Sequence, residues 1–238
     1  MGLLFAAATS AVLFRLPALA QSGHEHHHHG HGQHAMPMAM PAGGTNDHGS
    51  HSSHGHDVGP AGSTYDLRWI DAMVQHHTGA LRMSEFVFNV GAPGVGALAN
   101  TIWADQAIEI KAMGQWRKAW YPEAPIYPVV LRPGGDPNAM EDLIRMSAEQ
   151  IAGMRMMGST PTAQSRVTWF LEGMLEHHGA ALQMARDALE KSKNPTILLM
   201  AQEIILAQQH EIIQLRGMLR QGGLHKPSYY QFDELFWP

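Results

Sequence analysis

The chain contains no cysteine among its 238 residues. This absence excludes disulfide bridges, cysteine zinc sites, iron–sulfur clusters and a lipid-modified cysteine. The 16 methionines are therefore the only source of sulfur. A methionine thioether binds soft metal ions and cannot form a disulfide, which suits a metal-binding protein in an oxidising compartment.

Positive charge is also sparse, with 16 Lys and Arg against 21 Asp and Glu and a formal net charge of -5. The chain has no excess of positive charge that would attract the phosphates of nucleic acid, so we expect no DNA or RNA partner. The sequence has no P-loop, dinucleotide-binding, G-x-S-x-G or H-E-x-x-H motif. We therefore assign no catalytic residue and no residue that binds an organic cofactor.

One pattern, M-x-x-H-H-x-x-A-L-x-M, occurs twice in the chain. On an α-helix its methionines, first histidine and alanine share one face, and the second histidine borders that face. Imidazole and thioether groups on one helix face form a ligand mixture that suits copper. The predicted metal ligands in the two copies are Met73, His76, His77, Met83, Met174, His177, His178 and Met184.

The two histidines of each pair point about 100° apart around the helix axis, so they need not bind the same ion. If only one of each pair is a ligand, the methionine stripe favours His76 and His177. His77 and His178 would then reach a second ion or hydrogen-bond to Gln and Glu residues of the partner helices. Hydrogen bonds between helices explain those residues equally well, and they are Gln106, Glu109, Gln208 and Glu211.

Residues 1–20 form an apolar run that ends in Ala18-Leu19-Ala20, which is typical of a cleaved signal peptide. We therefore expect a periplasmic or secreted protein that has no membrane anchor after cleavage. The run is interrupted by Arg15 and is shorter than the roughly 20 apolar residues that a membrane span needs.

Residues 21–62 are rich in His, Gly, Ser and Pro and too poor in large apolar residues to fold, so we predict disorder. Eleven of the 17 histidines lie in this segment. We predict that the segment captures metal, with copper, nickel and zinc all open. Its candidate ligands are His26, His28, Met36, Met38 and Met40.

The rest of the chain predicts an all-α fold. Residues 63–120 form one helical hairpin, and residues 161–238 form a second hairpin with an aromatic C-terminal strap. Residues 121–160 supply a proline-rich crossing loop and a methionine-rich linker helix expected from Asp136 to Gly158. Because the two hairpins correspond in sequence, we predict a four-helix bundle that arose by internal duplication.

The motifs do not fit di-iron chemistry. Bundle di-iron enzymes use E-x-x-H, but the residue three before His76 is Met73, and the residue three before His177 is Met174. A thioether is a poor ligand for ferric iron, so we do not expect a ferroxidase. A cuprous oxidase stays an alternative, because His and Met ligands together support cycling between Cu(I) and Cu(II).

The two hairpins resemble the family catalogued as domain of unknown function 305. The family pattern F-[LI]-x-x-M-x-x-H-H-x-x-A-[LI]-x-M, followed by I-x-x-x-Q-x-x-E-I, is matched once from Trp69 and once from Phe170. Trp69 is the one departure, since the family prefers Phe there. Members of this family resemble ferritin-like helical bundles, and one is a periplasmic copper-binding protein that protects against copper excess. The resemblance therefore implies copper sequestration.

These observations favour an exported protein that sequesters or traffics Cu(I), with Cu(II) at the N-terminal segment, for copper tolerance. A copper efflux or chaperone protein would be the partner that receives the metal. Two alternatives stay open. One is a zinc or nickel buffer in which the N-terminal segment binds metal and the helix histidines are structural, and the other is a metal-free helical interaction module.

Overall fold

Four long helices make up most of the computed structural model, which describes residues 56–236. They are α1 (Tyr65–Glu85), α2 (Val95–Trp120), α4 (Arg166–Lys191) and α5 (Pro195–Gln221). The described residues belong to one compact unit, His48–Pro238. No helix within residues 56–236 is long and apolar enough to cross a membrane. The predicted signal peptide and the predicted ligands His26, His28, Met36, Met38 and Met40 lie outside the described residues.

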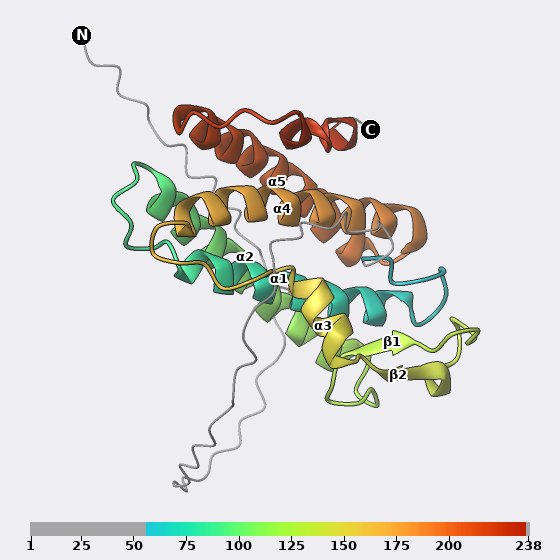
Figure 1. Ribbon diagram of the computed structural model, residues 1–238. Helices are drawn as coiled ribbons and strands as arrows, with labels where there is room; N and C mark the ends of the chain where they lie inside the picture. The colour runs from blue at the N-terminus through green and yellow to red at the C-terminus, as the bar shows by residue number, and fades with distance from the viewer. Residues whose placement is uncertain (1–55, 237–238) are drawn as a thin grey trace, which may run out of the picture. The chain divides into compact units, whose positions relative to one another are not determined.

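Each pair of consecutive long helices forms a hairpin. In Figure 1, α1 packs against α2 and α4 packs against α5, and the two hairpins meet through α1 and α4. The two helices that contain the M-x-x-H-H pattern are therefore the inner contact of the bundle. This arrangement confirms the predicted fold class, an all-α bundle built from two helical hairpins.

Local sequence signals explain where these helices begin and end. Gly94 adopts a φ of 79°, and α2 begins directly after it. At the start of α5, the Asn194 side chain accepts a hydrogen bond from the Thr196 N–H at 3.0 Å, and Pro195 occupies the first turn. Helix α4 begins at Arg166, five residues after the predicted start, because the hydroxyls of Thr162 and Ser165 fold the preceding residues into a turn.

The predicted linker helix is wrong over its first half. Residues 129–145 instead form a short antiparallel hairpin, β1 (Val129–Leu131) with β2 (Leu143–Arg145), in which Val130 lies opposite Ile144. A 3-10 turn, η1 (Met140–Asp142), precedes β2. Asp136 does not cap a helix. Its carboxylate accepts a hydrogen bond from the Asn138 N–H at 2.9 Å and so closes a tight turn.

The linker helix α3 is short and covers only Ala148–Arg155. It begins at a capping box, in which the Ser147 hydroxyl accepts from the Gln150 N–H and the Gln150 side chain accepts from the Ser147 N–H. It ends at Met156, whose φ of 49° is left-handed. Helix α3 and strand β1 both pack on α1.

The C-terminal residues lie along the second hairpin. Two 3-10 turns, η2 (Pro227–Tyr230) and η3 (Asp233–Phe236), follow α5 and run back along the bundle (Figure 1). The Arg216 side chain donates to the Tyr229 carbonyl at 2.5 Å, and the Arg186 side chain donates to the Leu235 carbonyl at 2.6 Å. The two hairpins are thus covered by different segments.

The described structure also begins earlier than the sequence predicts. Residues 56–62, which the sequence places in a disordered segment, have a defined course against the bundle. The Arg68 side chain donates to the carbonyls of Val58 and Pro60, and the Thr64 N–H donates to the Pro137 carbonyl at 3.1 Å. From the end of α4, the Lys191 ammonium also donates to the Gly59 carbonyl at 3.1 Å. Local composition does not reveal this contact, because Lys191 is distant from Gly59 in sequence.

Candidate metal centre

The four helix histidines meet where α1 and α4 pack together. His76, His77, His177 and His178 have no solvent exposure. The ring centroids of His76 and His177 are 3.7 Å apart, so the two hairpins touch through one histidine each. The rings of His77 and His178 lie 6.1 Å and 6.3 Å from those of their neighbours His76 and His177. The repeated motif therefore forms a single histidine cluster, defined here as these four residues.

The second histidine of each pair contacts a glutamate on the partner helix. The Nε2 atom of His77 lies 2.6 Å from a carboxylate oxygen of Glu109 on α2. The Nε2 atom of His178 lies 2.8 Å from a carboxylate oxygen of Glu211 on α5. Contact with these two glutamates is therefore present, and coordination of a second ion by His77 or His178 stays a prediction. The side-chain amides of Gln106 and Gln208 are buried without a hydrogen-bond partner in the described chain.

The contact of His77 shows where one of its protons lies. A carboxylate accepts hydrogen bonds only, so Nε2 of His77 donates to Glu109, whereas Nε2 of His178 lies close to Glu211 without forming a hydrogen bond. The Nε2 of His177 likewise lies 3.0 Å from the backbone carbonyl oxygen of His76. Within residues 56–236, the Nδ1 atoms of all four histidines are buried and have no hydrogen-bond partner. A metal-binding histidine commonly has this arrangement, with one nitrogen on an acceptor and the other free to coordinate.

Burial keeps the central imidazoles neutral. It lowers the pKa of His76 and of His177 well below the usual histidine value, and the neighbouring histidines lower both further. At neutral pH both rings are therefore uncharged. Neutral imidazole is the form that coordinates a metal ion, since protonation removes the lone pair.

Unpaired buried nitrogens are costly, which makes their concentration here informative. A buried polar atom without a partner costs about 1–3 kcal/mol, so folded proteins contain few of them. Four such Nδ1 atoms lie in one cluster, together with the Nε2 atoms of His76 and His178, which also have no hydrogen-bond partner in the described chain. A group that accepts their lone pairs would remove this cost, and a metal ion is such a group. The donor set of the cluster therefore fits a metal.

The predicted methionine ligands of the two helix motifs are all buried. Met73 and Met174 have no exposure, Met83 has 1% and Met184 has 2%. Met83 and Met174 belong to one hydrophobic cluster, and the Met83 methyl group packs at the α4 glycine Gly173. In this structure these two side chains fill the core. Coordination by the four methionines stays a prediction.

A fifth histidine, which the sequence does not single out, lies beside the cluster. The His56 ring is 5.7 Å from the His76 ring and nearly perpendicular to it, at 84°. His56 is partly exposed, whereas His76 is fully buried. The only sequence signal for His56 is that it ends the histidine-rich segment.

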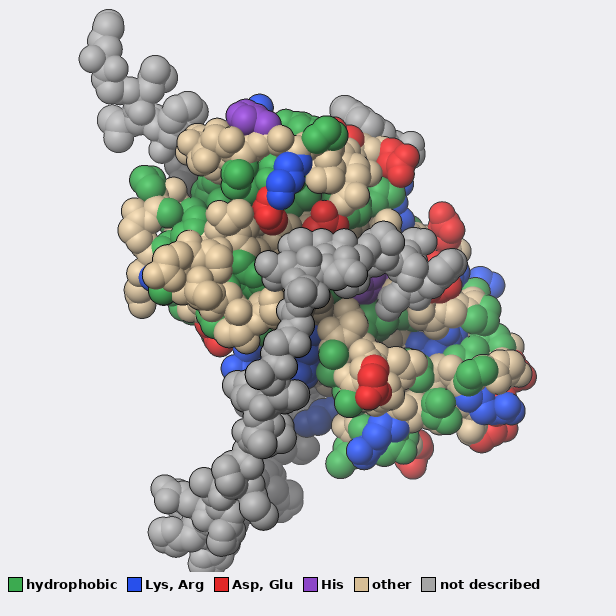
Figure 2. Space-filling model, in the orientation of Figure 1, with side chains coloured by type: hydrophobic (Ala, Val, Ile, Leu, Met, Phe, Trp, Pro, Cys, Tyr) green, Lys and Arg blue, Asp and Glu red, His purple; other side chains and the backbone are tan. Residues whose placement is uncertain are grey.

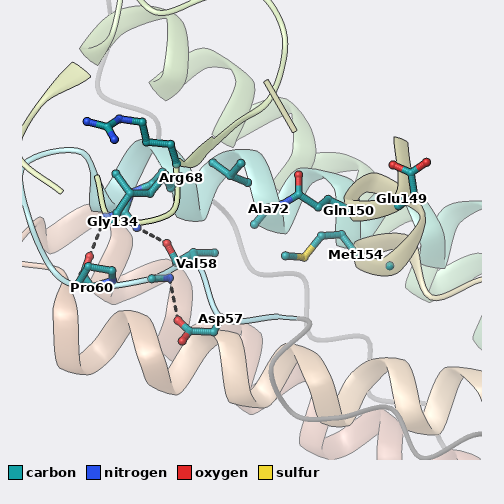
Figure 3. A pocket seen from close by; sticks show the side chains of 14 residues that line it. Asp57, Val58, Pro60, Arg68, Ala72, Gly134, Glu149, Gln150 and Met154 are labelled. Carbon is teal, nitrogen blue, oxygen red and sulfur yellow. Dashed lines mark hydrogen bonds between the residues drawn. The ribbon is translucent and has the colours of Figure 1, made fainter. Parts of the chain in front are cut away.

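Among residues 56–236, no three His, Asp or Glu side chains are arranged as a ready-made metal cage. A metal at the cluster would therefore need thioether ligands, or side chains that turn toward it on binding. A cavity of about 600 Å³ lies elsewhere, between the 57–60 segment, α1, β1 and α3 (Figure 3). It has no histidine in its wall. The buried cluster, rather than this cavity, holds the groups suited to metal chemistry.

The surface shows no field of one charge on the face drawn in Figure 2. Over the coloured part of that face, Lys and Arg side chains alternate with Asp and Glu side chains. This mixed pattern agrees with the small net charge of -5.

Comparison with known proteins identifies the bundle. Residues 66–219 match the model of the DUF305 family, the domain of unknown function 305, and His56 lies outside that match. A crystal structure of a DUF305 protein from Streptomyces coelicolor has a TM-score of 0.50 and 21% identity, covering 68% of this chain and 95% of that one. A DUF305 fragment from Deinococcus radiodurans gives 0.49 and 24%, covering 68% and 99%.

CopM in its Cu(I)-bound form gives a TM-score of 0.46 with 24% identity, over 66% of this chain and 96% of CopM. The uncharacterised protein L153 of Acanthamoeba polyphaga mimivirus is 36% identical over 60 residues, which span 25% of this chain and only 40% of that protein. The family match covers most of the helical bundle and both histidine motifs. The chain belongs to the DUF305 family.

Proposed function

We propose that this protein binds copper at the histidine cluster between α1 and α4 and thereby sequesters it. One observation supports this most strongly. Four buried imidazoles meet there, of which those of His76 and His177 are neutral, and the Nδ1 atom of each of the four has no hydrogen-bond partner within residues 56–236. None of these nitrogens is satisfied by a group of the described chain. Metal coordination is the simplest chemistry that would use them together.

The surrounding groups favour copper over harder metals. The two carboxylates nearest the cluster, Glu109 and Glu211, are already in contact with His77 and His178. The remaining candidate ligands are imidazoles and thioethers, which suit copper and serve magnesium or calcium poorly. Zinc and nickel also bind imidazole, so they stay the alternative metals, as does a metal-free bundle that serves only for interaction.

Burial suits storage rather than turnover. A copper ion at a cluster with no solvent exposure is shielded from oxidants and leaves only when side chains move. We propose that the protein holds copper outside the cytoplasm, with export resting on the predicted signal peptide, and passes it to a copper efflux or chaperone protein. Oxygen uptake by the Cu(I)-loaded protein tests the alternative of a cuprous oxidase, and we expect none above the rate of free copper.

The direct test is anaerobic Cu(I) titration of the whole chain against a chromophoric chelator. The variant joins His76→Leu with His177→Leu, which removes the central pair while keeping apolar bulk. Three of the four ring nitrogens that this variant removes have no hydrogen-bond partner in the described chain, and replacing unpaired buried polar groups by apolar ones is nearly neutral or stabilising, so it should fold. We expect it to lose the tightest-bound copper and to keep the weaker binding of the N-terminal segment.

The matched control joins His210→Ala with His225→Ala, which removes two exposed histidines. It should leave the tight binding unchanged. Equal copper binding by the wild type and the His76 and His177 variant would refute the proposal. A parallel titration with Zn(II) separates the metals, since tighter competition by Zn(II) than by Cu(I) would support the zinc alternative.

A further inference from the structure

The segment Asp57–Pro60 is fastened to both hairpins. From α1, the Arg68 guanidinium donates to the carbonyl of Val58 and, at 2.7 Å, to that of Pro60 (Figure 3). From α4, the Lys191 ammonium donates to the Gly59 carbonyl at 3.1 Å and lies 3.4 Å from an Asp57 carboxylate oxygen. Arg68 is only 1% exposed, so its anchor is part of the folded core.

This anchor determines where the histidine-rich segment joins the bundle. The residue directly before it is His56, whose ring stands 5.7 Å from the ring of His76. His56 is partly exposed, whereas His76 and His177 are fully buried. Among the described histidines, His56 is thus the one that is both partly exposed and next to the ring of His76. A metal ion captured by the N-terminal segment would meet it first.

We propose that His56 is the transfer ligand through which copper passes from the N-terminal segment to the buried pair His76 and His177. The inference rests on the proposed copper function. In the transfer step, a Cu–N bond to His76 forms as the Cu–N bond to His56 breaks. The oxidation state of copper does not change, and no proton moves, because the neutral His76 ring already has a free lone pair. The Asp57–Pro60 anchor positions His56 for this exchange.

Stopped-flow transfer of Cu(I) from a chromophoric chelator to the whole chain tests this role. The N-terminal segment should take copper in a fast phase, and the buried pair should take it in a slow phase that the His76→Leu, His177→Leu variant lacks. His56→Ala should slow that second phase by about tenfold, equivalent to about 1.4 kcal/mol in the barrier, with its amplitude unchanged. The equilibrium affinity of the buried pair should stay near that of the wild type.

Two further variants test whether the position of His56, rather than the number of histidines in the segment, determines the rate of the slow phase. His54→Ala removes a histidine two residues earlier and should leave the slow phase unchanged. Lys191→Met keeps every histidine but removes the α4 side of the anchor, and it should slow the second phase in the same direction as His56→Ala. Circular dichroism and thermal unfolding establish that each variant is folded.

The outcomes are distinct from those for the proposed function. Absence of any slow phase sensitive to His76 and His177 in the wild type would refute copper binding at the cluster itself. A slow phase that is present but has the same rate in His56→Ala would overturn only the transfer role. Loss of its amplitude in His56→Ala would also overturn that role, because His56 would then be a permanent ligand.

Discussion

The two hairpins share their interior and differ in what covers them. In the first, His77 contacts Glu109, and in the second, His178 contacts Glu211, with nearly equal distances of 2.6 Å and 2.8 Å. Outside this core, β1 and α3 pack on α1, whereas the C-terminal turn η3 packs on α4. The parts retained in both copies are therefore the histidines and their glutamates, and the parts that differ are the coverings.

One pair of equivalent acidic residues shows how the coverings attach. Asp71 on α1 accepts two hydrogen bonds from Arg117 and one from the Val129 N–H, which holds strand β1. Its counterpart Glu172 on α4 accepts from Lys226 and from the Tyr229 hydroxyl, which hold the C-terminal segment. The same position on each motif helix thus anchors a different segment. The duplicated core tolerates either covering.

The largest expected difference between the hairpins comes from removing these two carboxylates. Asp71 is 4% exposed, and Asp71→Ala removes the ion-pair partner of Arg117 and leaves the Arg117 Nε–H and a strand N–H without their acceptor, so we expect a loss of about 3 kcal/mol. Glu172 and Lys226 are 26% and 53% exposed at their side chains, so Glu172→Ala should cost about 1 kcal/mol. Urea unfolding of both variants measures the difference. Equal losses would contradict the unequal burial.

A second difference lies at the glycine after the first histidine pair. A Cβ at Gly79 would lie 1.9 Å from the Arg155 carbonyl oxygen, so α3 can approach α1 only because this residue is glycine. The equivalent residue of the second hairpin is Ala180, and α3 packs on α1 of the first hairpin instead. Gly79→Ala should cost about 2–3 kcal/mol by overpacking, despite the better helix propensity of alanine.

The reciprocal variant is the control for Gly79→Ala. Ala180→Gly should cost about 1 kcal/mol, the usual penalty for glycine inside a helix. Thermal unfolding of both variants and of the wild type measures the two losses of stability. A stability gain in Gly79→Ala would show that α3 can move away without cost, and α3 would then be a loose attachment.

The sequence predicts the shared interior well. Asn194-Pro195 and the glycines before Val95 indicate the starts of α5 and α2, and the repeated motif predicts two helix faces lined with histidine and methionine, which could form one shared site or two. The coverings are harder to predict. Strands β1 and β2 have three residues each and depend on the contact between Asp71 and Val129, which are 58 positions apart. The capping box at Ser147 was the available local signal for the true start of α3.

The candidate site also has one part that the sequence predicts and another that it does not. Helical periodicity places His76 and His177 on the methionine-lined faces, but it leaves open whether the two histidines share one site. Their contact, with ring centroids 3.7 Å apart, is seen only in the structure. Periodicity also does not reveal that His56 joins them. That position depends on Arg68 and Lys191, which hold the backbone of the preceding segment from two different helices. A composition typical of disorder cannot indicate such contacts, because they use backbone carbonyls that every sequence has.

The glutamates test whether the two halves of the cluster are equivalent. Glu109→Gln and Glu211→Gln keep the side-chain shape but weaken the acceptor that orients His77 and His178. Loss of such an orienting partner typically lowers metal affinity about 10–100-fold, and the side chains of the two glutamates are 12% and 11% exposed. Competitive Cu(I) titration should therefore give similar losses in both variants. Unchanged affinity in both would separate the glutamates from metal binding.

The smallest expected effect concerns a carboxylate that only the first hairpin has. Burial raises the pKa of Asp105, and the carboxylates of Glu211 and Glu109 raise it further, while the equivalent residue of α5 is Ala207. A raised pKa in the folded state means that folding favours the protonated form, so ionisation of Asp105 destabilises the protein as pH rises through this pKa. Asp105→Asn should then stabilise the protein by a fraction of 1 kcal/mol at pH 7, a modest gain because the residue is largely solvated.

The sign of this effect can be checked by pH. The gain from Asp105→Asn should disappear as pH falls below the pKa of an ordinary aspartate, since the wild-type carboxyl is then protonated in both the folded and the unfolded chain. Urea unfolding at pH 7 and near pH 3 measures the two limits. A gain that persists at the acidic limit would mean that the asparagine acts through packing. The Asp105 charge, which the second hairpin lacks, would then not contribute to the difference in stability between the two hairpins.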